Sequence, residues 1–230
     1  MCHSRGNVRQ QFLFAVAVNR AAQGDLAVRG DNLDVLRIDR QGVLLANFPP
    51  DLASDLQVGL AGALIDRGHR RIGLITNADP EYTASADRMA GYQQALETAG
   101  IAFEPALVRY GDFTPYGGDV AMTDLLKLTP RPTAFFLASD TVALGALQAI
   151  RRSGLRVPDE VALVGFDDVP LSDLIDPPLT TIRLPAYGLG WGAAEMLIRL
   201  IGKEELQPAS VILETELVVR KSSGPALNSH

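Results

Sequence analysis

The chain has few of the side chains from which disulfides and metal sites are built. It contains one cysteine, Cys2, and three histidines in 230 residues. A single cysteine cannot form an intramolecular disulfide, which suits a reducing compartment. Two histidines lie near the chain ends, and only His69 is internal, so no cluster has the spacing of metal ligands. We therefore expect neither a metal nor another cofactor.

Positive charge is also scarce. Lysine and arginine number 21 against 27 aspartates and glutamates, and the formal net charge is −6. A basic footprint for nucleic acid is therefore missing. If the protein serves DNA regulation, we expect the DNA reader to lie outside this chain.

Long hydrophobic runs are absent as well. The run from Phe12 to Val18 has seven residues, far below the ~18 that a membrane-spanning helix needs. It follows Arg5 and Arg9, and its length is at the lower edge for the apolar core of a signal peptide. We expect a cytoplasmic protein that has no membrane partner.

What the sequence does contain is an alternation of short β-branched runs with longer helical patterns from Arg70 onward. The predicted strands cover residues 71–76, 105–110, 133–138, 160–165, 180–184 and 211–219. The predicted helices cover residues 84–99, 117–128, 141–153 and 189–201. This alternation indicates an α/β fold with a parallel, Rossmann-like sheet covered by helices on both faces.

The first fifty residues have a different character, with charge, glycine and asparagine mixed into brief apolar runs. Residues 35–38 and 43–45 could be strands, and a helix is expected over 51–67, ending at Gly68. We therefore divide the chain into an atypical amino-terminal region, 1–50, a main domain, 51–221, and a frayed tail, 222–230.

Ligands of open parallel sheets bind beyond the carboxyl ends of the strands. Carboxylates there accept hydrogen bonds from hydroxyls, arginine donates in a fixed fork, and aromatic rings pack on a sugar ring or a base. Gly-x-Ser-x-Gly does not occur and His69 precedes a strand, so we expect no catalytic triad. The candidate ligand-binding residues are Arg88, Phe113, Ser139, Asp140, Phe166 and Asp167.

Each candidate also has a purely structural alternative. Asp140 or Ser139 would serve as the N-cap of the helix that follows. Asp167 and the next aspartate would shape a turn. The two phenylalanines would anchor loops in the core, and Arg88 would pair with a nearby acidic side chain at the surface.

Eight segments together resemble the effector-binding part of LacI/GalR-type transcriptional regulators. They occur in the family's order and at its spacing. The segments are Gly68–Ile75, Arg88–Leu96, Gly111–Phe113, Arg131–Phe135, Ala138–Leu147, Leu155–Asp168, Pro177–Ile182 and Glu214–Arg220.

The resemblance implies a periplasmic-binding-protein-like fold of type I, with the effector held between two Rossmann-like lobes. One lobe is nearly whole here and the second is incomplete. By motif position, Arg88, Phe113, Ser139 and Asp167 fall where the family places effector contacts, and Asp140 adjoins them. The implied effector is a sugar or sugar derivative, with a purine or nucleoside as the alternative. The implied assembly is a homodimer whose DNA affinity changes with effector binding.

The sequence departs from the family at its amino-terminal end. The helix-turn-helix is not seen, so DNA is an expected partner only if that unit is joined to this chain. Residues 1–30 show neither the opening strand nor the Asn-Pro-aromatic loop and long helix of the first lobe. We expect region 1–50 to be a remnant of that lobe. Two alternatives are a solute-binding protein of a sugar transporter and a dimerising fragment that binds no ligand.

Overall fold

The computed structural model describes residues 60–202 and 210–225, together with the backbone of four strands nearer the amino terminus. These strands are β1 (Gln11–Ala17), β2 (Ala27–Gly30), β3 (Leu33–Ile38) and β4 (Leu44–Ala46). Residues 60–65 are helical, as predicted, and the earlier part of that predicted helix lies outside the described residues. The predicted strands at 35–38 and 43–45 correspond to β3 and β4.

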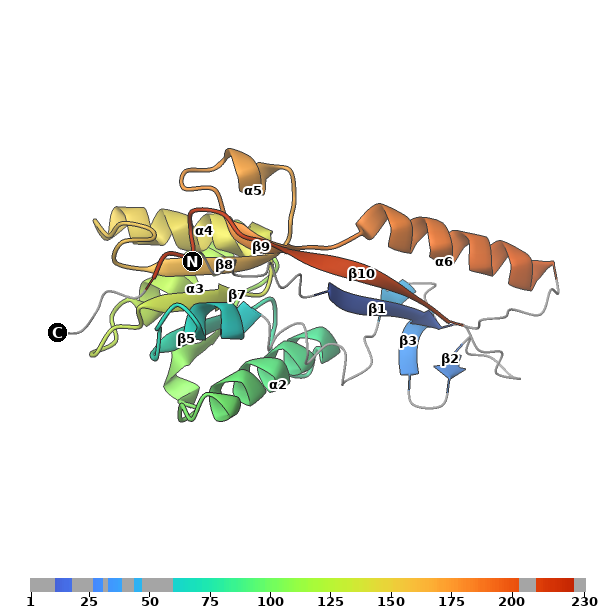
Figure 1. Cartoon of the computed structure of the whole chain (residues 1–230), viewed down its shortest axis with the longest axis horizontal. Helices are drawn as coiled ribbons and strands as arrows, with labels where there is room; N and C mark the ends of the chain where they lie inside the picture. Colours follow the sequence, from blue (N-terminus) through green and yellow to red (C-terminus); the bar gives the residue numbers. More distant parts are fainter. Residues whose placement is uncertain are drawn as a thin grey trace, which may run out of the picture.

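Seven strands form the main sheet, in the order β1-β10-β9-β8-β7-β5-β6 (Figure 1). The strands not yet given are β5 (Ile72–Thr76), β6 (Val108–Tyr110), β7 (Ala134–Leu137), β8 (Ala162–Asp167), β9 (Thr180–Arg183) and β10 (Ser210–Val218). Strands β5 to β9 pair in parallel, whereas β10 and β1 join the sheet antiparallel. Strands β2, β3 and β4 form a separate antiparallel sheet.

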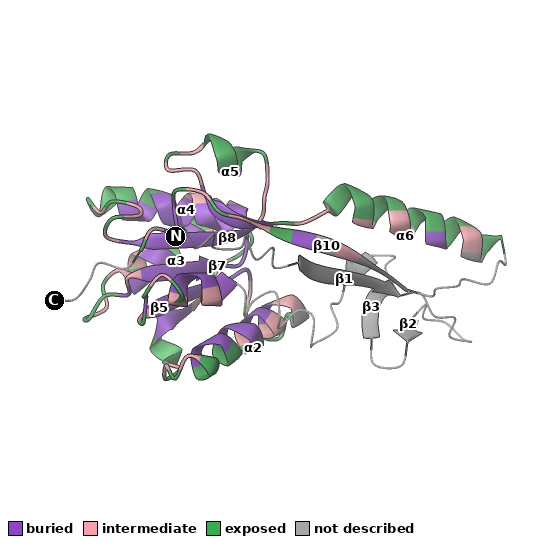
Figure 2. Ribbon diagram, in the orientation of Figure 1, coloured by how far each residue is buried: buried purple, intermediate pink, exposed green. Residues whose placement is uncertain are grey.

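Helices cover both faces of the parallel part of the sheet. The helical segments are α2 (Thr83–Thr98), η1 (Pro105–Leu107), α3 (Pro115–Leu125), α4 (Asp140–Arg152), α5 (Leu171–Leu174) and α6 (Ala186–Ile201). Phe135 and Phe136 are neighbours on β7 and enter opposite core clusters, because successive strand residues point to opposite faces. One cluster includes Tyr92 and Leu96 of α2, and the other includes residues of α3 and α4. Figure 2 shows the buried strands between these layers. The predicted α/β fold is confirmed.

Several element boundaries differ from the prediction, and one short helix was not predicted. The predicted strand 105–110 begins with the 3-10 turn η1, because Pro105 has no N–H to donate to a sheet. Strand β8 continues to Asp167, past the predicted end at residue 165. Helix α5 has four residues, which is too short to show a helical period in the sequence.

The carboxyl-terminal segment is ordered further than predicted. Ser222 and Ser223 are buried. The amide of Ser222 donates to Pro178 O, the amide of Leu163 donates to Ser222 O, and Nε2 of His69 lies 3.0 Å from Gly224 O. The prediction of a frayed tail therefore does not hold for residues 222–224, which pack beside β8. Residues 226–230 lie outside the described part.

Residues 1–30 contain two strands, β1 and β2, that the sequence pattern did not predict. Strand β1 pairs with β10 from Gln11↔Glu216 to Ala17↔Ser210. Helix α6 lies along this pair, away from α3 and α4 (Figure 1). Its outer side exposes Tyr187 and Trp191, whose rings stack 6.2 Å apart. None of the described helices is long and apolar enough to cross a membrane.

Candidate functional site

The parallel strands bring polar residues together at one edge of the sheet. Asn77 follows β5, Ser139 follows β7 and Asp167 ends β8. The hydroxyl of Ser139 donates to Asn77 Oδ1 at 2.9 Å and accepts from the amide of Val142 at 3.3 Å. Ser139 is therefore the N-cap of α4, as its structural alternative predicted, and it also ties the ends of two strands together.

Arg88 of α2 is a buried cation beside this edge. Its guanidinium carbon lies 4.9 Å from the centroid of the Phe166 ring, and Nη1 donates to Ala84 O at 2.9 Å. Nε has no hydrogen-bond partner among the described residues. Burial lowers the pKa of Arg88, and the nearby Asp167 opposes that effect. The surface ion pair that was the structural alternative does not form within the described part of the chain. A buried donor without an acceptor is costly, which marks this nitrogen as available to a ligand.

Asp167 provides an acceptor near Arg88. No described residue donates a hydrogen bond to its carboxylate. Burial, followed by the charge of Asp140, raises the pKa of Asp167 to about 7, and Arg88 opposes this rise. Its backbone has φ 117°, a conformation that side-chain-bearing residues rarely adopt. A carboxyl group whose pKa is raised in this way can donate a hydrogen bond when protonated and accept one when ionised.

Phe113 projects outward from the loop between β6 and α3. Its backbone has φ 64° and its side chain is 48% exposed, so the alternative of a core anchor is wrong. Asp112 Oδ1 accepts from the amide of Thr114 at 3.0 Å, and the Thr114 hydroxyl caps α3. The ring meets Tyr82 edge-on, with centroids 5.3 Å apart. A bulky residue at positive φ is strained, and here the surrounding turn holds it with a ring exposed.

Asp140 and Phe166 lie behind this surface. The carboxylate of Asp140 is fully buried and accepts from the Ser172 hydroxyl at 2.5 Å, the Thr181 hydroxyl at 2.7 Å and the Val169 amide at 3.2 Å. Phe166 is 2% exposed, in the core as its structural alternative predicted, with its ring facing Arg88. Asp140 therefore fixes the chain after β8, and Phe166 supports Arg88.

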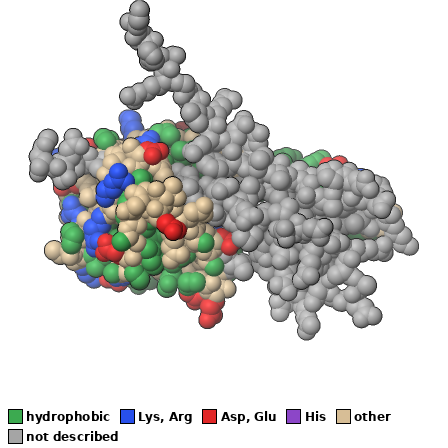
Figure 3. Space-filling view, turned by 60° about the horizontal axis from the view of Figure 1, so that its bottom comes forward, with side chains coloured by type: hydrophobic (Ala, Val, Ile, Leu, Met, Phe, Trp, Pro, Cys, Tyr) green, Lys and Arg blue, Asp and Glu red, His purple; other side chains and the backbone are tan. Residues whose placement is uncertain are grey.

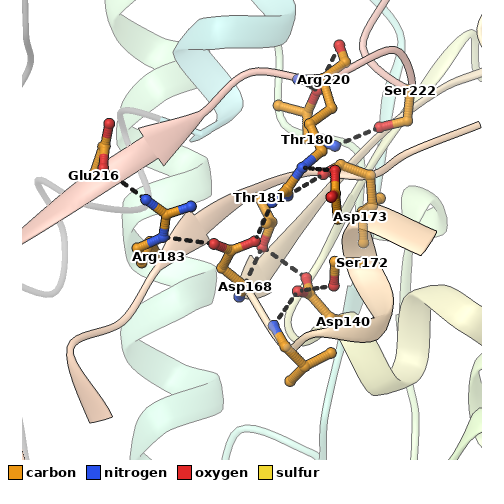
Figure 4. A network of polar contacts seen from close by, with 12 residues as sticks. Asp140, Asp168, Ser172, Asp173, Thr180, Thr181, Arg183, Glu216, Arg220 and Ser222 are labelled. Carbon is orange, nitrogen blue, oxygen red and sulfur yellow. Dashed lines mark hydrogen bonds and ion pairs between the residues drawn. The ribbon is translucent and has the colours of Figure 1, made fainter. Parts of the chain in front are cut away.

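Asp168 is the centre of a network of ion pairs (Figure 4). Its Oδ2 lies 2.7 Å from Nε of Arg183, and its Oδ1 lies 2.7 Å from Nη2 of Arg220. Arg183 also contacts Glu216 of β10 at 3.1 Å. The side chain of Asp168 is only 6% exposed. This residue connects the end of β8 to β9, to β10 and to the carboxyl-terminal segment.

Sequence reasoning did not select Asn77, Tyr82 or Asp168 as site residues. Asn77 and Tyr82 lie between the predicted first strand and the helix after it, and that position was the available signal. The described residues contain no group of three histidine, cysteine or acidic side chains arranged to hold a metal. On the face shown in Figure 3, basic and acidic side chains are interspersed with hydrophobic ones, unlike the continuous basic stripe of a nucleic-acid reader.

Comparison with known proteins gives a consistent result. The periplasmic binding protein-like domain matches residues 61–223. CelR of Thermobifida fusca, an HTH-type transcriptional regulator, is 42% identical over 159 residues, which cover 69% of this chain and 46% of CelR. The repressor CytR of Escherichia coli K12 is 40% identical over 160 residues, covering 70% of this chain and 47% of CytR.

Solved structures agree with these matches. A CelR–cellobiose complex superimposes with a TM-score of 0.69 and 39% identity, covering 74% of this chain and 52% of that one. CcpA of Lactococcus lactis superimposes with a TM-score of 0.69 and 29% identity, covering 74% and 62%. The chain spans about half the length of CelR and CytR, and the match lies in the periplasmic-binding-protein-like region. The chain therefore belongs to the periplasmic binding protein-like domain family, and it is similar to that region of LacI-family transcriptional regulators.

Proposed function

We propose that this domain binds a sugar or sugar derivative and that binding regulates transcription without any catalytic step. The observation that carries the proposal is the pairing of two unused groups at one strand edge. Nε of the buried Arg88 has no hydrogen-bond partner within the described residues. No described residue donates a hydrogen bond to the carboxylate of Asp167, whose charge acts on Arg88. A neutral polyol supplies both missing partners, because each hydroxyl donates and accepts.

The proposal gives each residue a role. Arg88 donates to a ring or hydroxyl oxygen, and Asp167 accepts a hydroxyl hydrogen. Phe113, with Tyr82 beside it, offers a ring face to the apolar side of the sugar. Ser139 supplies a hydroxyl at the same edge. The solved complex of the similar CelR with cellobiose supports a sugar as the ligand class.

Asp140 and Phe166 have supporting roles in this proposal, which changes their expected direct contact with the ligand. Both oxygens of Asp140 already accept internal hydrogen bonds. The Phe166 ring is buried and faces Arg88. We propose that the two residues hold Asp167 and Arg88 in place.

The assembly implied by the family is part of the proposal. A homodimer would present two such domains, and effector binding would change the DNA affinity of attached helix-turn-helix units. Coupling of this kind requires the ligand to bind one conformation more tightly than the other. Sedimentation of the purified chain at several concentrations tests the dimer separately from ligand binding.

A thermal-shift screen tests ligand binding. The probes are glucose, ribose, cellobiose, adenosine and hypoxanthine. A ligand that binds only the folded state stabilises it by RT ln(1 + [L]/Kd), so the melting temperature rises. We expect a shift with a sugar, and loss of that shift in Arg88→Gln and Asp167→Asn. Arg131→Gln, at an exposed position, is the matched control. A full shift retained in both site variants would refute the site, and a shift with hypoxanthine alone would refute the ligand class.

A further inference from the structure

Two consecutive residues at the end of β8 have backbone conformations that cost free energy. Asp167 has φ 117° and Asp168 has φ 55°. Neither residue is glycine, and L side chains crowd the backbone at such angles. Strain of this kind persists only where the surroundings hold the chain in place. The structure must therefore contain contacts that fix this turn.

The carboxylate of Asp167 is not one of those contacts. Arg88 of α2 and Asp140 of α4 are the charged groups that act on it, and it accepts no hydrogen bond from the described residues. The amide of Leu184 donates to Asp167 O at 3.3 Å, which is a backbone contact. The direction of the Asp167 side chain therefore depends on the conformation of its backbone. That conformation depends in turn on the contacts that hold Asp168.

Asp168 supplies that anchor through its side chain. Nε of Arg183 donates a hydrogen bond to Oδ2 of its buried carboxylate at 2.7 Å (Figure 4). Nη2 of Arg220 lies 2.7 Å from Oδ1 as an ion pair without hydrogen-bond geometry. Arg220 is itself held, because its Nη1 donates to Leu179 O at 2.8 Å and its amide donates to the Thr180 hydroxyl at 2.9 Å. A buried carboxylate between two cations, one of them fixed by main-chain contacts, has little freedom to move.

The backbone around Asp168 is fixed on its other side by Asp140. The amide of Asp168 donates to the Thr181 hydroxyl at 3.4 Å, and that hydroxyl donates to Asp140. The next amide, of Val169, donates to Asp140 directly. Asp140 thus holds the chain after the turn, and the ion pairs of Asp168 hold the turn itself.

We propose that Asp168 is a positioning residue whose ion pairs with Arg183 and Arg220 hold the strained turn and direct the carboxylate of Asp167 toward Arg88. The inference rests on the proposed role of Asp167 in effector binding. Arg183 also contacts Glu216 on β10. Strand β10 pairs with β1, and α6 lies along these two strands (Figure 1). Through Arg183, the turn is joined to the strands leading away from the parallel sheet.

The test measures the titration of the Asp167 carboxyl group by carbon-detected NMR in the full chain, with the signal assigned by its loss in Asp167→Asn. In the wild type we expect a midpoint near 7. In Arg183→Gln we expect the midpoint to fall by one unit or more, because a released turn lets the carboxyl group reach solvent. The simple loss of a nearby positive charge would instead raise the midpoint. The sign of the change therefore separates positioning from through-space electrostatics.

Asp168→Asn should lower the midpoint further. Asp173→Asn is the matched control, because Asp173 also contacts Arg220, at 3.3 Å, but lies outside the turn. Should Asp168→Asn fail to fold, Arg183→Gln decides alone, since the Arg183 side chain is 51% exposed. An unchanged or raised midpoint in Arg183→Gln overturns the proposal, as does an equal fall in Asp173→Asn. The titration needs no effector, so a failed ligand screen would refute the proposed function without deciding this one.

Discussion

Replacing Asp167 with asparagine should stabilise the ligand-free domain at alkaline pH while removing effector binding. The folded state raises the pKa of this carboxyl group to about 7 from an ordinary value of 3.8. A carboxyl whose folded pKa is raised binds protons that the unfolded state has already lost. Its contribution therefore lowers stability as pH rises from about 4 to about 7, and the loss is complete above 7. Asparagine is neutral throughout this range and does not incur the loss.

The size of the effect follows from the shift. About three pKa units at 1.36 kcal/mol each give a ceiling of about 4 kcal/mol at pH 8. The variant also loses the attraction between Asp167 and the buried Arg88, which offsets part of the gain. We expect a net stabilisation of about 1–3 kcal/mol at pH 8, with the two proteins converging near pH 4. In a domain of this size that corresponds to about 3–10 °C in melting temperature.

Urea unfolding of both proteins from pH 4.5 to pH 8.5 measures the difference. Other groups titrate over the same range, and subtracting the variant's curve from that of the wild type cancels their contributions. The reasoning is refuted if the difference in unfolding free energy stays constant with pH, or if the variant loses stability relative to wild type as pH rises. This result would show that the ionised Asp167 carboxylate lowers the unfolding free energy of the ligand-free domain.

Three further predictions follow from other parts of the domain. Gly165→Ala should cost about 1–3 kcal/mol of unfolding free energy, because a Cβ there would lie 2.3 Å from Asp140 Oδ1; a urea midpoint equal to wild type would contradict this. Burial lowers the pKa of His69, so its contribution to stability is present above pH 6.5 and is lost as pH falls; His69→Gln should flatten the loss of stability between pH 7 and pH 5, and an unchanged slope would rule the effect out. Tyr82→Ala should weaken effector binding by about 0.5–1.5 kcal/mol in calorimetric titration, with a melting temperature close to wild type; equal affinity would exclude Tyr82 from the site.

Much of the fold could be predicted because it depends on local pattern. Continuous apolar strands alternating with amphipathic helices leave few arrangements other than a covered parallel sheet. The edge where Arg88, Ser139 and Asp167 gather follows from that topology, since the carboxyl ends of parallel strands share an edge. The strain at Phe113 was hidden, because nothing in its neighbours requires a positive φ.

What could not be predicted depends on contacts between distant parts of the chain. The sequence offered turn-shaping as one role for Asp168, but its partners Arg183 and Arg220 come from β9 and from the segment after β10. Ser222 lies in a run of small and polar residues that is typical of a tail. Ser222 is buried because it packs between β8 and residues 178–180, where its hydroxyl accepts a hydrogen bond from the Thr180 amide. Local sequence propensity cannot predict this packing, because the contacts of Ser222 are with residues far away in the sequence.

The carboxyl-terminal segment sets the order in which the site can be completed during synthesis. Arg220 secures Asp168, yet α5, β9, α6 and β10 all leave the ribosome between the two residues. At about 5–20 residues per second, the turn that carries Asp167 waits several seconds for its second cation. The nascent domain can form its central strands and α2 to α4 in that interval. The turn at Asp167 and Asp168 still lacks its contact with Arg220. The proposed ligand site can therefore be completed only after residue 220 has been synthesised.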